Sequence, residues 1–141
     1  NADTCIIEIV ERNLNTFQKS APIMPAPRRD IGKADFSYTS SITSFESSNF
    51  ENYTKINGVL DELCMDVDSE IYIRIVNDNQ IYTYEAFPVY EKDITKVTCD
   101  YGYVAYLDNI NIQSGKYEVE VITRKDGKLM TTGNVGNITI E

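Results

Sequence analysis

The side chains that could do chemistry in this chain are carboxylates, tyrosines and three cysteines, because the sequence contains no His. Without an imidazole it lacks the general base of Ser-His-Asp and Cys-His sites and the commonest side-chain ligand of metals. Glu118 and Glu120 lie two residues apart, a spacing that could present paired carboxylates for glycoside hydrolysis. The sequence supplies neither a cleft nor a cause for a raised carboxyl pKa, so we expect both glutamates on an exposed strand face. It therefore predicts no catalytic residue, and a small carboxylate-based hydrolase stays only as an alternative.

The acidic stretch from Asp61 to Glu70 is dense enough in carboxylates to suggest a calcium site. A calcium loop of the EF-hand type needs Gly at its sixth position and a carboxylate at its twelfth. Counted from Asp66, those positions hold Ile71 and Asn77. We therefore expect an exposed acidic turn, no metal site and no cofactor.

A tyrosine-rich segment is the better candidate for a binding site. Residues 100–109 combine aromatic rings with carboxylate and amide groups, a mixture that suits both sugars and protein partners. On a regular strand Tyr101 and Tyr103 share one face, whereas Tyr106 points to the other. The sequence predicts a ligand-binding surface made by Asp100, Tyr101, Tyr103 and Asn109, and the alternative is a set of ordinary half-buried strand tyrosines.

Charge, hydropathy and cysteine content limit the partners. The formal net charge of −9 opposes binding to a phosphate backbone, so nucleic acid is not expected. The apolar runs are far shorter than the roughly 20 residues that a membrane-spanning helix needs, so no transmembrane span is expected. Three cysteines permit at most one internal disulfide. The sequence leaves open whether Cys64 and Cys99 are bridged or all three remain buried thiols.

The first third of the chain is organised differently from the rest. Residues 4–18 fit an amphipathic helix and a β-branched strand equally well. Residues 21–27 hold three of the four prolines, which favours an extended arm. We expect a boundary near residue 33, with an N-terminal helix or strand plus Pro-rich arm in 1–33 and a β-sandwich domain in 34–141. Apolar residues at three- and four-residue steps within 53–67 predict a short helix.

After Ser69 the hydrophobic period changes to two. Residues 71–76 and 81–87 form a predicted hairpin that Pro88 ends or places at an edge. Further strands are predicted at 96–99, 103–107, 110–112 and 117–123, and the Asp126-Gly127 pair predicts a tight hairpin turn after the last of them.

The final strand poses a problem of parity. If the strand runs unbroken from a two-residue turn at Asp126-Gly127, Val135 and Ile138 fall on opposite faces of it. One extra residue in a strand reverses its pleat. We therefore predict β-bulges at Gly133 and Gly136, which return these side chains to the core.

The segment 110–121, with the Asp126-Gly127 turn and the strand after it, resembles the last three strands of immunoglobulin-like and fibronectin type III domains. In those domains a tyrosine at the start of the penultimate strand forms a tyrosine corner. The resemblance implies that Tyr117, which follows the turn at Gly115, hydrogen-bonds backward to the chain near Ile112.

The same resemblance implies the fold class. We expect a mostly-β chain, an immunoglobulin-like antiparallel β-sandwich with one or two short helices outside it. The sequence has no Trp and so departs from the antibody-type core, which leaves an α+β fold as the alternative.

An acidic, Tyr- and Asn-rich domain behind a Pro-rich tether is similar to small lipoproteins of Gram-negative gut bacteria. The resemblance implies an exported protein, periplasmic or at the cell surface, with a possible lipid anchor upstream of Asn1. We expect a non-catalytic binding or assembly module whose partner is a protein or a surface polysaccharide. A carbohydrate-binding module is the alternative.

Overall fold

The computed structural model describes residues 24–31, 38–39, 42–60, 69–92 and 99–141, and within these ranges the chain is mostly β. One 3₁₀ turn, η3 (Asn109–Asn111), is the only helical element in these ranges. The eight strands are β1 (Tyr38–Thr39), β2 (Ile42–Asn49), β3 (Tyr53–Leu60), β4 (Glu70–Val76), β5 (Ile81–Lys92), β6 (Cys99–Asp108), β7 (Gly115–Lys125) and β8 (Lys128–Ile140). The mostly-β prediction is confirmed, and the α+β alternative finds no support in the described part of the chain.

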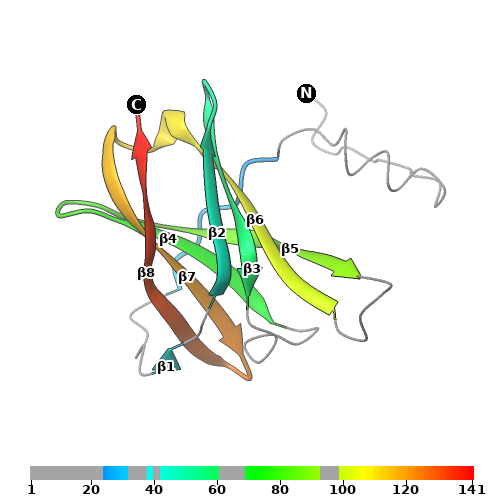
Figure 1. Cartoon of the computed structure of the whole chain (residues 1–141). Helices are drawn as coiled ribbons and strands as arrows, with labels where there is room; N and C mark the ends of the chain where they lie inside the picture. The colour runs from blue at the N-terminus through cyan, green and yellow to red at the C-terminus, as the bar shows by residue number, and fades with distance from the viewer. Residues whose placement is uncertain (1–23, 32–37, 40–41, 61–68, 93–98) are drawn as a thin grey trace, which may run out of the picture.

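The strands form one strongly curled sheet in the order β1-β8-β7-β4-β5-β6-β3-β2 (Figure 1). Strand β5 joins the two halves of the curl, because Ile81–Ala86 pairs with β4 and Phe87–Lys92 pairs with β6. The predicted hairpin of β4 and β5 is therefore present. Pro88 does not end β5, but it lies just after the change of partner, where β5 pairs with β6 alone among the described residues, so the predicted edge position is the one observed.

Two predicted elements are wrong. The segment expected to form a helix at 53–67 is strand β3 over residues 53–60, with every second residue buried. Ile56 and Leu60 are four residues apart, a spacing that fits the helical period and the strand period alike. The strand expected at 110–112 is η3 and the residue after it, because Asp108 caps the turn through the amide of Ile110 (3.1 Å). The N-terminal helix-or-strand question concerns residues 4–18, outside the described ranges.

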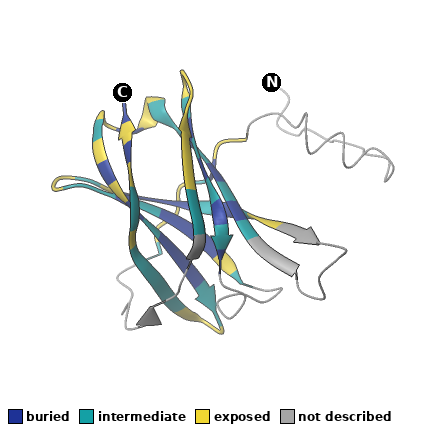
Figure 2. Ribbon diagram, viewed as in Figure 1, coloured by how far each residue is buried: buried dark blue, intermediate teal, exposed yellow. Residues whose placement is uncertain are grey.

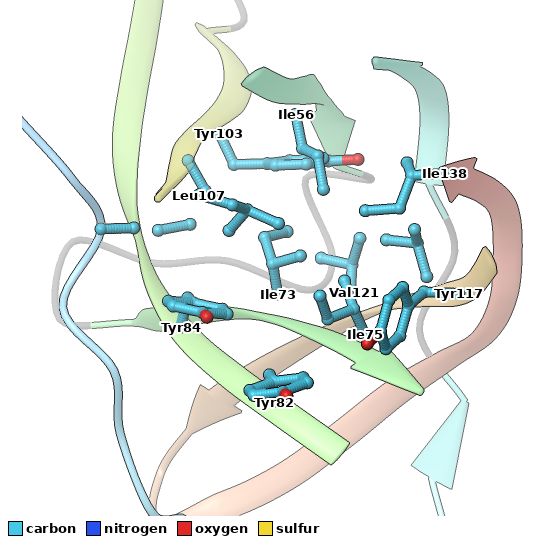
Figure 3. Close-up of a cluster of buried hydrophobic side chains, with 14 of the residues drawn as sticks. Ile56, Ile73, Ile75, Tyr82, Tyr84, Tyr103, Leu107, Tyr117, Val121 and Ile138 are labelled. Carbon is cyan, nitrogen blue, oxygen red and sulfur yellow. The ribbon is translucent and has the colours of Figure 1, made fainter. Parts of the chain in front are cut away.

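The core fills the inside of the curl. Figure 2 shows buried positions along the middle of the strands and exposed positions at the turns. Ile71, Ile73 and Ile75, on one face of β4, are all buried. They pack with side chains from the other strands, including Ile56, Tyr82, Tyr84, Tyr103, Leu107, Tyr117, Val121 and Ile138 (Figure 3).

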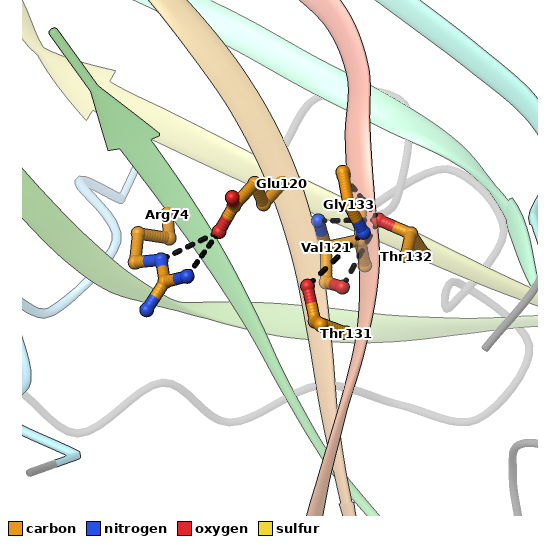
Figure 4. A network of polar contacts seen from close by, with 6 residues as sticks. All are labelled: Arg74, Glu120, Val121, Thr131, Thr132 and Gly133. Atoms are coloured by element: carbon orange, nitrogen blue, oxygen red, sulfur yellow. Dashed lines mark hydrogen bonds and ion pairs between the residues drawn. The ribbon is translucent and has the colours of Figure 1, made fainter. Parts of the chain in front are cut away.

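The bulges predicted in β8 are present. The register with β7 shifts on each side of Glu120, and each shift inserts one extra residue into β8. At the first bulge Gly133 has a φ of 68°. The Thr132 hydroxyl replaces the missing backbone partner of Val121: it accepts from the Val121 amide (3.0 Å) and lies 3.2 Å from the Val121 carbonyl oxygen (Figure 4). At the second, Gly136 donates its amide to Oδ1 of Asn134 (2.9 Å).

The turn that precedes β8 has the predicted conformation. Asp126 and Gly127 have φ values of 52° and 73°, both in the left-handed region. Two such residues in a row form the tight turn whose twist matches that of a hairpin.

Tyr117 makes the backward hydrogen bond that the resemblance to immunoglobulin-like domains implies. Its hydroxyl donates to the carbonyl oxygen of Gln113 (2.6 Å), one residue after Ile112. Tyr82 accepts from the Gln113 amide (3.3 Å), and the two tyrosine rings meet edge to face at 5.9 Å. Burial, followed by the neighbouring Tyr82, raises the pKa of Tyr117. The loop before β7 is therefore fixed to the core through both the backbone amide and the carbonyl oxygen of Gln113.

Residues 24–31, which we call the strap, lie between β5 and β6 (blue in Figure 1). Ala26 donates its amide to the Tyr106 carbonyl oxygen (2.8 Å) and is itself only 6% exposed. Pro27 accepts from the Glu85 amide (2.9 Å). These contacts make the described part of the Pro-rich arm a component of the β-domain, although it precedes the boundary expected near residue 33.

No helix in the described ranges has the length and apolar character required to cross a membrane.

Candidate functional site

The structure does not bring the four predicted ligand-binding residues together. Asp100 lies near the start of β6 and Asn109 directly follows its end, and at roughly 3.3 Å per strand residue Asp100 and Asp108 are about 26 Å apart along the strand. The backbone of Tyr101 pairs with Leu60 of β3 and Tyr90 of β5, while the side chains of Asp100 and Tyr101 are outside what the structure describes.

Tyr103 belongs to the core, so its assignment to an exposed platform is wrong. Its side chain is 1% exposed and lies against Gly58 on β3, which leaves space for the ring. The hydroxyl donates to the Ser44 carbonyl oxygen at 3.5 Å, and burial raises the pKa of the phenol. The inner face of β6 carries Tyr103, Ala105 and Leu107, all buried, so a solvent-borne ligand does not reach this ring.

An aromatic surface exists on the opposite face of the same strand. Phe50, Tyr53 and Tyr106, which we call the aromatic cluster, come from the β2–β3 turn, the start of β3 and the end of β6. The rings of Phe50 and Tyr53 stack at 4.4 Å with an interplanar angle of 15°. Tyr106 meets Tyr53 edge to face at 5.9 Å. Phe50 remains 47% exposed, so an aromatic ring is accessible to solvent while supported from beneath.

Hydrogen bonds hold the turn that carries this cluster. Phe50 donates its amide to the Tyr53 carbonyl oxygen (2.8 Å) and closes the turn. Thr54, with no exposed surface, donates its hydroxyl to Oδ1 of Asn109 (2.9 Å) and lies 3.2 Å from Oδ1 of Asn49. Asn109 also donates its amide to the Asn52 carbonyl oxygen (3.1 Å). Asn109 thus supports the aromatic cluster through the backbone beneath it.

Two polar residues adjoin the cluster. Asn52, which precedes Tyr53 in the chain, is exposed, and Lys55 lies directly opposite Tyr106 on the outer face of the sheet. Asp108 accepts from the Ile110 amide and from Nδ2 of Asn111 (2.6 Å), so its carboxylate is used in capping η3. The arrangement offers an apolar ring face with the exposed amide of Asn52 next to it in the chain. Such a surface binds ligands that have both hydrophobic patches and hydroxyl groups.

The second candidate, the carboxylates of β7, has a structural use. Glu120 lies opposite Arg74 on β4 and accepts from its Nε (2.6 Å), with both side chains half-buried (Figure 4). On the same face Glu70 pairs with Arg124 (2.8 Å) and accepts from the Tyr72 hydroxyl. These cross-strand pairs neutralise charge on the outer face of β4 and β7.

The predicted disulfide and the acidic stretch lie largely beyond what the structure describes. Cys64 and residues 61–68 are outside the described ranges, and of Cys99 only the backbone is described. A bridge between Cys64 and Cys99 stays a prediction. Among the described residues no group of three or more carboxylate or thiol side chains is placed to hold a metal ion.

The chain matches no known protein-family model, and no curated protein is similar to it in sequence.

Proposed function

We propose that this protein is a non-catalytic, exported binding module that recognises a polysaccharide at the cell surface through the aromatic cluster. The half-exposed Phe50 ring, stacked on Tyr53, is the observation on which the proposal depends. The apolar face of a sugar ring packs on an aromatic ring, while its hydroxyl groups need donors and acceptors such as the exposed amide of Asn52, which precedes Tyr53 in the chain.

Preorganisation of the ring pair also favours ligand binding. A side chain that is ordered before binding loses little conformational freedom on binding, so more of the contact energy becomes affinity. Phe50 is ordered by its stack on Tyr53 and by the hydrogen-bonded turn beneath it.

The proposal includes an immunoglobulin-like fold, which the strand order supports. An immunoglobulin domain has strands A, B, E and D in one sheet and C, F and G in the other. Here β2, β3, β6 and the second half of β5 follow the order A-B-E-D, while β8, β7 and β4 follow G-F-C. The hydrogen bond from Tyr117 to Gln113 lies where the tyrosine corner of these domains lies. Many domains with this architecture are binding modules, and that likeness is one of fold rather than of site.

The test is a binding screen of the full chain against purified surface polysaccharides, followed by titration of those that bind. Phe50→Ala removes the exposed ring, and we expect it to weaken binding about tenfold or more. Ile81→Ala is the matched control, because Ile81 is also exposed (62%) but lies on the half of β5 that pairs with β4. Binding to proteins but to no polysaccharide, or equal affinities of wild type and Phe50→Ala, would contradict the proposal.

A further inference from the structure

The strap occupies the place where two strands of the sheet separate. Strand β5 pairs with β6 only from Phe87 onward, so the segments containing Thr83 and Glu85 on β5 and Tyr106 on β6 do not pair with each other. The strap joins these edges: Ala26 bonds to Tyr106, Pro27 to Glu85, and Arg29 donates its amide to the Thr83 carbonyl oxygen (2.9 Å).

Apart from Ala26 and these backbone hydrogen bonds, the strap is attached by contacts of exposed side chains. The Arg28 guanidinium lies 4.5 Å from the centre of the Tyr82 ring, and Arg29 pairs with Glu85 at 2.6 Å. The side chains of that ion pair are 53% and 39% exposed, and exposed pairs stabilise little because water competes for both charges. Ala26 contributes one methyl group to the core. Prolines at positions 25 and 27 remove two amide donors from the strap.

Tyr106 belongs to both the strap contact and the aromatic cluster. Strand β3 holds one edge of β6 at Tyr106, through the register with Lys55. The strap holds the other edge through the bond from Ala26. The Tyr106 ring in turn packs edge-on against Tyr53, beneath the exposed ring of Phe50. The position of the strap therefore determines how firmly Tyr106, which supports the cluster, is held.

We propose that the strap positions the aromatic cluster through Tyr106, and that Arg28 and Arg29 are the positioning residues that hold the strap in place. The inference rests on the proposed function. With the strap seated, Tyr106 is fixed on both strand edges and the cluster is ready to bind. With the strap displaced, this end of β6 becomes an edge strand held on one side only. The rings are then ordered only when ligand binds, and the conformational entropy lost in ordering them lowers the affinity.

The test compares the full chain with the Arg28→Ala/Arg29→Ala double variant. Lys116→Ala/Lys128→Ala is the control, since it removes the same charge from β7 and β8. NMR measures hydrogen exchange of the Ala26 amide and the nuclear Overhauser contact between the rings of Tyr53 and Tyr106. Titration with a polysaccharide that binds the wild type measures affinity. We expect faster exchange at Ala26, a weaker ring contact and a several-fold loss of affinity in the arginine variant only.

Each other outcome counts against the inference. Unchanged affinity with a rapidly exchanging Ala26 amide would show that the strap does not affect the site. Continued protection of Ala26 would show that the arginines do not hold the strap. The single variant Arg29→Ala, which removes only the exposed ion pair, provides the same readouts if the double variant unfolds. If the wild type binds no polysaccharide, the proposed function fails, and a ring contact that persists after strap release would separately overturn this inference.

Discussion

Replacement of Gly58 by Ala tests how β2, β3 and β6 pack on the inner face of the sheet. A Cβ at this position would clash with the carbonyl oxygen of Ser44 and would lie 2.6 Å from the Tyr103 hydroxyl oxygen. The Ser44 oxygen belongs to the backbone of β2, which is in register with β3, and the Tyr103 ring is 1% exposed. Neither group can move without shifting a strand or a core side chain.

We expect the Gly58→Ala variant to lose stability. Adding a methyl group to a filled core costs about 1–3 kcal/mol, and replacing Gly by Ala within a strand returns about 0.5–1 kcal/mol. The net expectation is a loss of about 1–2 kcal/mol in the free energy of unfolding, which corresponds to a Tm lowered by roughly 3–8 °C for a domain of this size.

Urea unfolding followed by circular dichroism measures this loss, with Gly102→Ala as the control. A Cβ at position 102 would lie 3.1 Å from the Val89 carbonyl oxygen, a contact that small adjustments relieve, so we expect a change of less than about 1 kcal/mol. A Gly58→Ala protein as stable as the wild type would refute the packing of Tyr103 over Gly58, and with it the inward position of that ring.

Three further substitutions have expected effects on stability. Tyr117→Phe removes the hydrogen bond to Gln113, and we expect a loss of about 1 kcal/mol in urea unfolding; no loss would show that this bond does not stabilise the loop. Thr123 is fully buried and its hydroxyl has no partner among the described residues, so Thr123→Val should gain about 1 kcal/mol or more, and a destabilised variant would contradict this. Burial raises the pKa of Tyr84 to about 12, whereas an exposed tyrosine titrates near 10. Because the folded state keeps a proton that the unfolded chain loses, stability should be complete below about pH 10 and fall as the pH rises from about 10 to about 12, with a smaller fall in Tyr84→Phe; equal slopes for both proteins would exclude this cause.

The part of the fold that could be predicted from the sequence depends on short-range rules. The β7–β8 hairpin follows from Asp126-Gly127, since few residue pairs adopt two positive φ values. The bulges follow from the parity of Val135 and Ile138, because a strand must keep its apolar side chains on one face. The bond from Tyr117, which the resemblance to immunoglobulin-like domains implied, also spans only four residues.

Errors arose where a local pattern fits two structures. The spacing of Ile56 and Leu60 suits a helix and a strand, and only pairing with β2 and β6 selects the strand. Gly58, which weakens a helix, is explained by the Tyr103 ring on the neighbouring strand. No local signal in residues 53–60 encodes that neighbour.

The candidate site was missed because its residues come from three separate elements. The alternation along β6 correctly separates Tyr103 from Tyr106, but it does not say which face is buried. The partners that decide the question, Phe50 and Tyr53, are more than fifty residues earlier in the chain. In the register of β3 and β6, Gly58 lies opposite Tyr103. Knowledge of that pairing would have allowed Tyr103 to be predicted as a buried residue.

The central claim is that a polysaccharide ligand contacts the aromatic cluster, and a titration observed by NMR tests it most directly. The wild-type chain is titrated with a surface polysaccharide while the ring signals of Phe50, Tyr53 and Tyr106 are followed. The account predicts saturable shifts of these three residues, with the signals of the Asp126-Gly127 turn unchanged. Shifts centred on that turn, or ring signals that do not move while ligand binds, would contradict it.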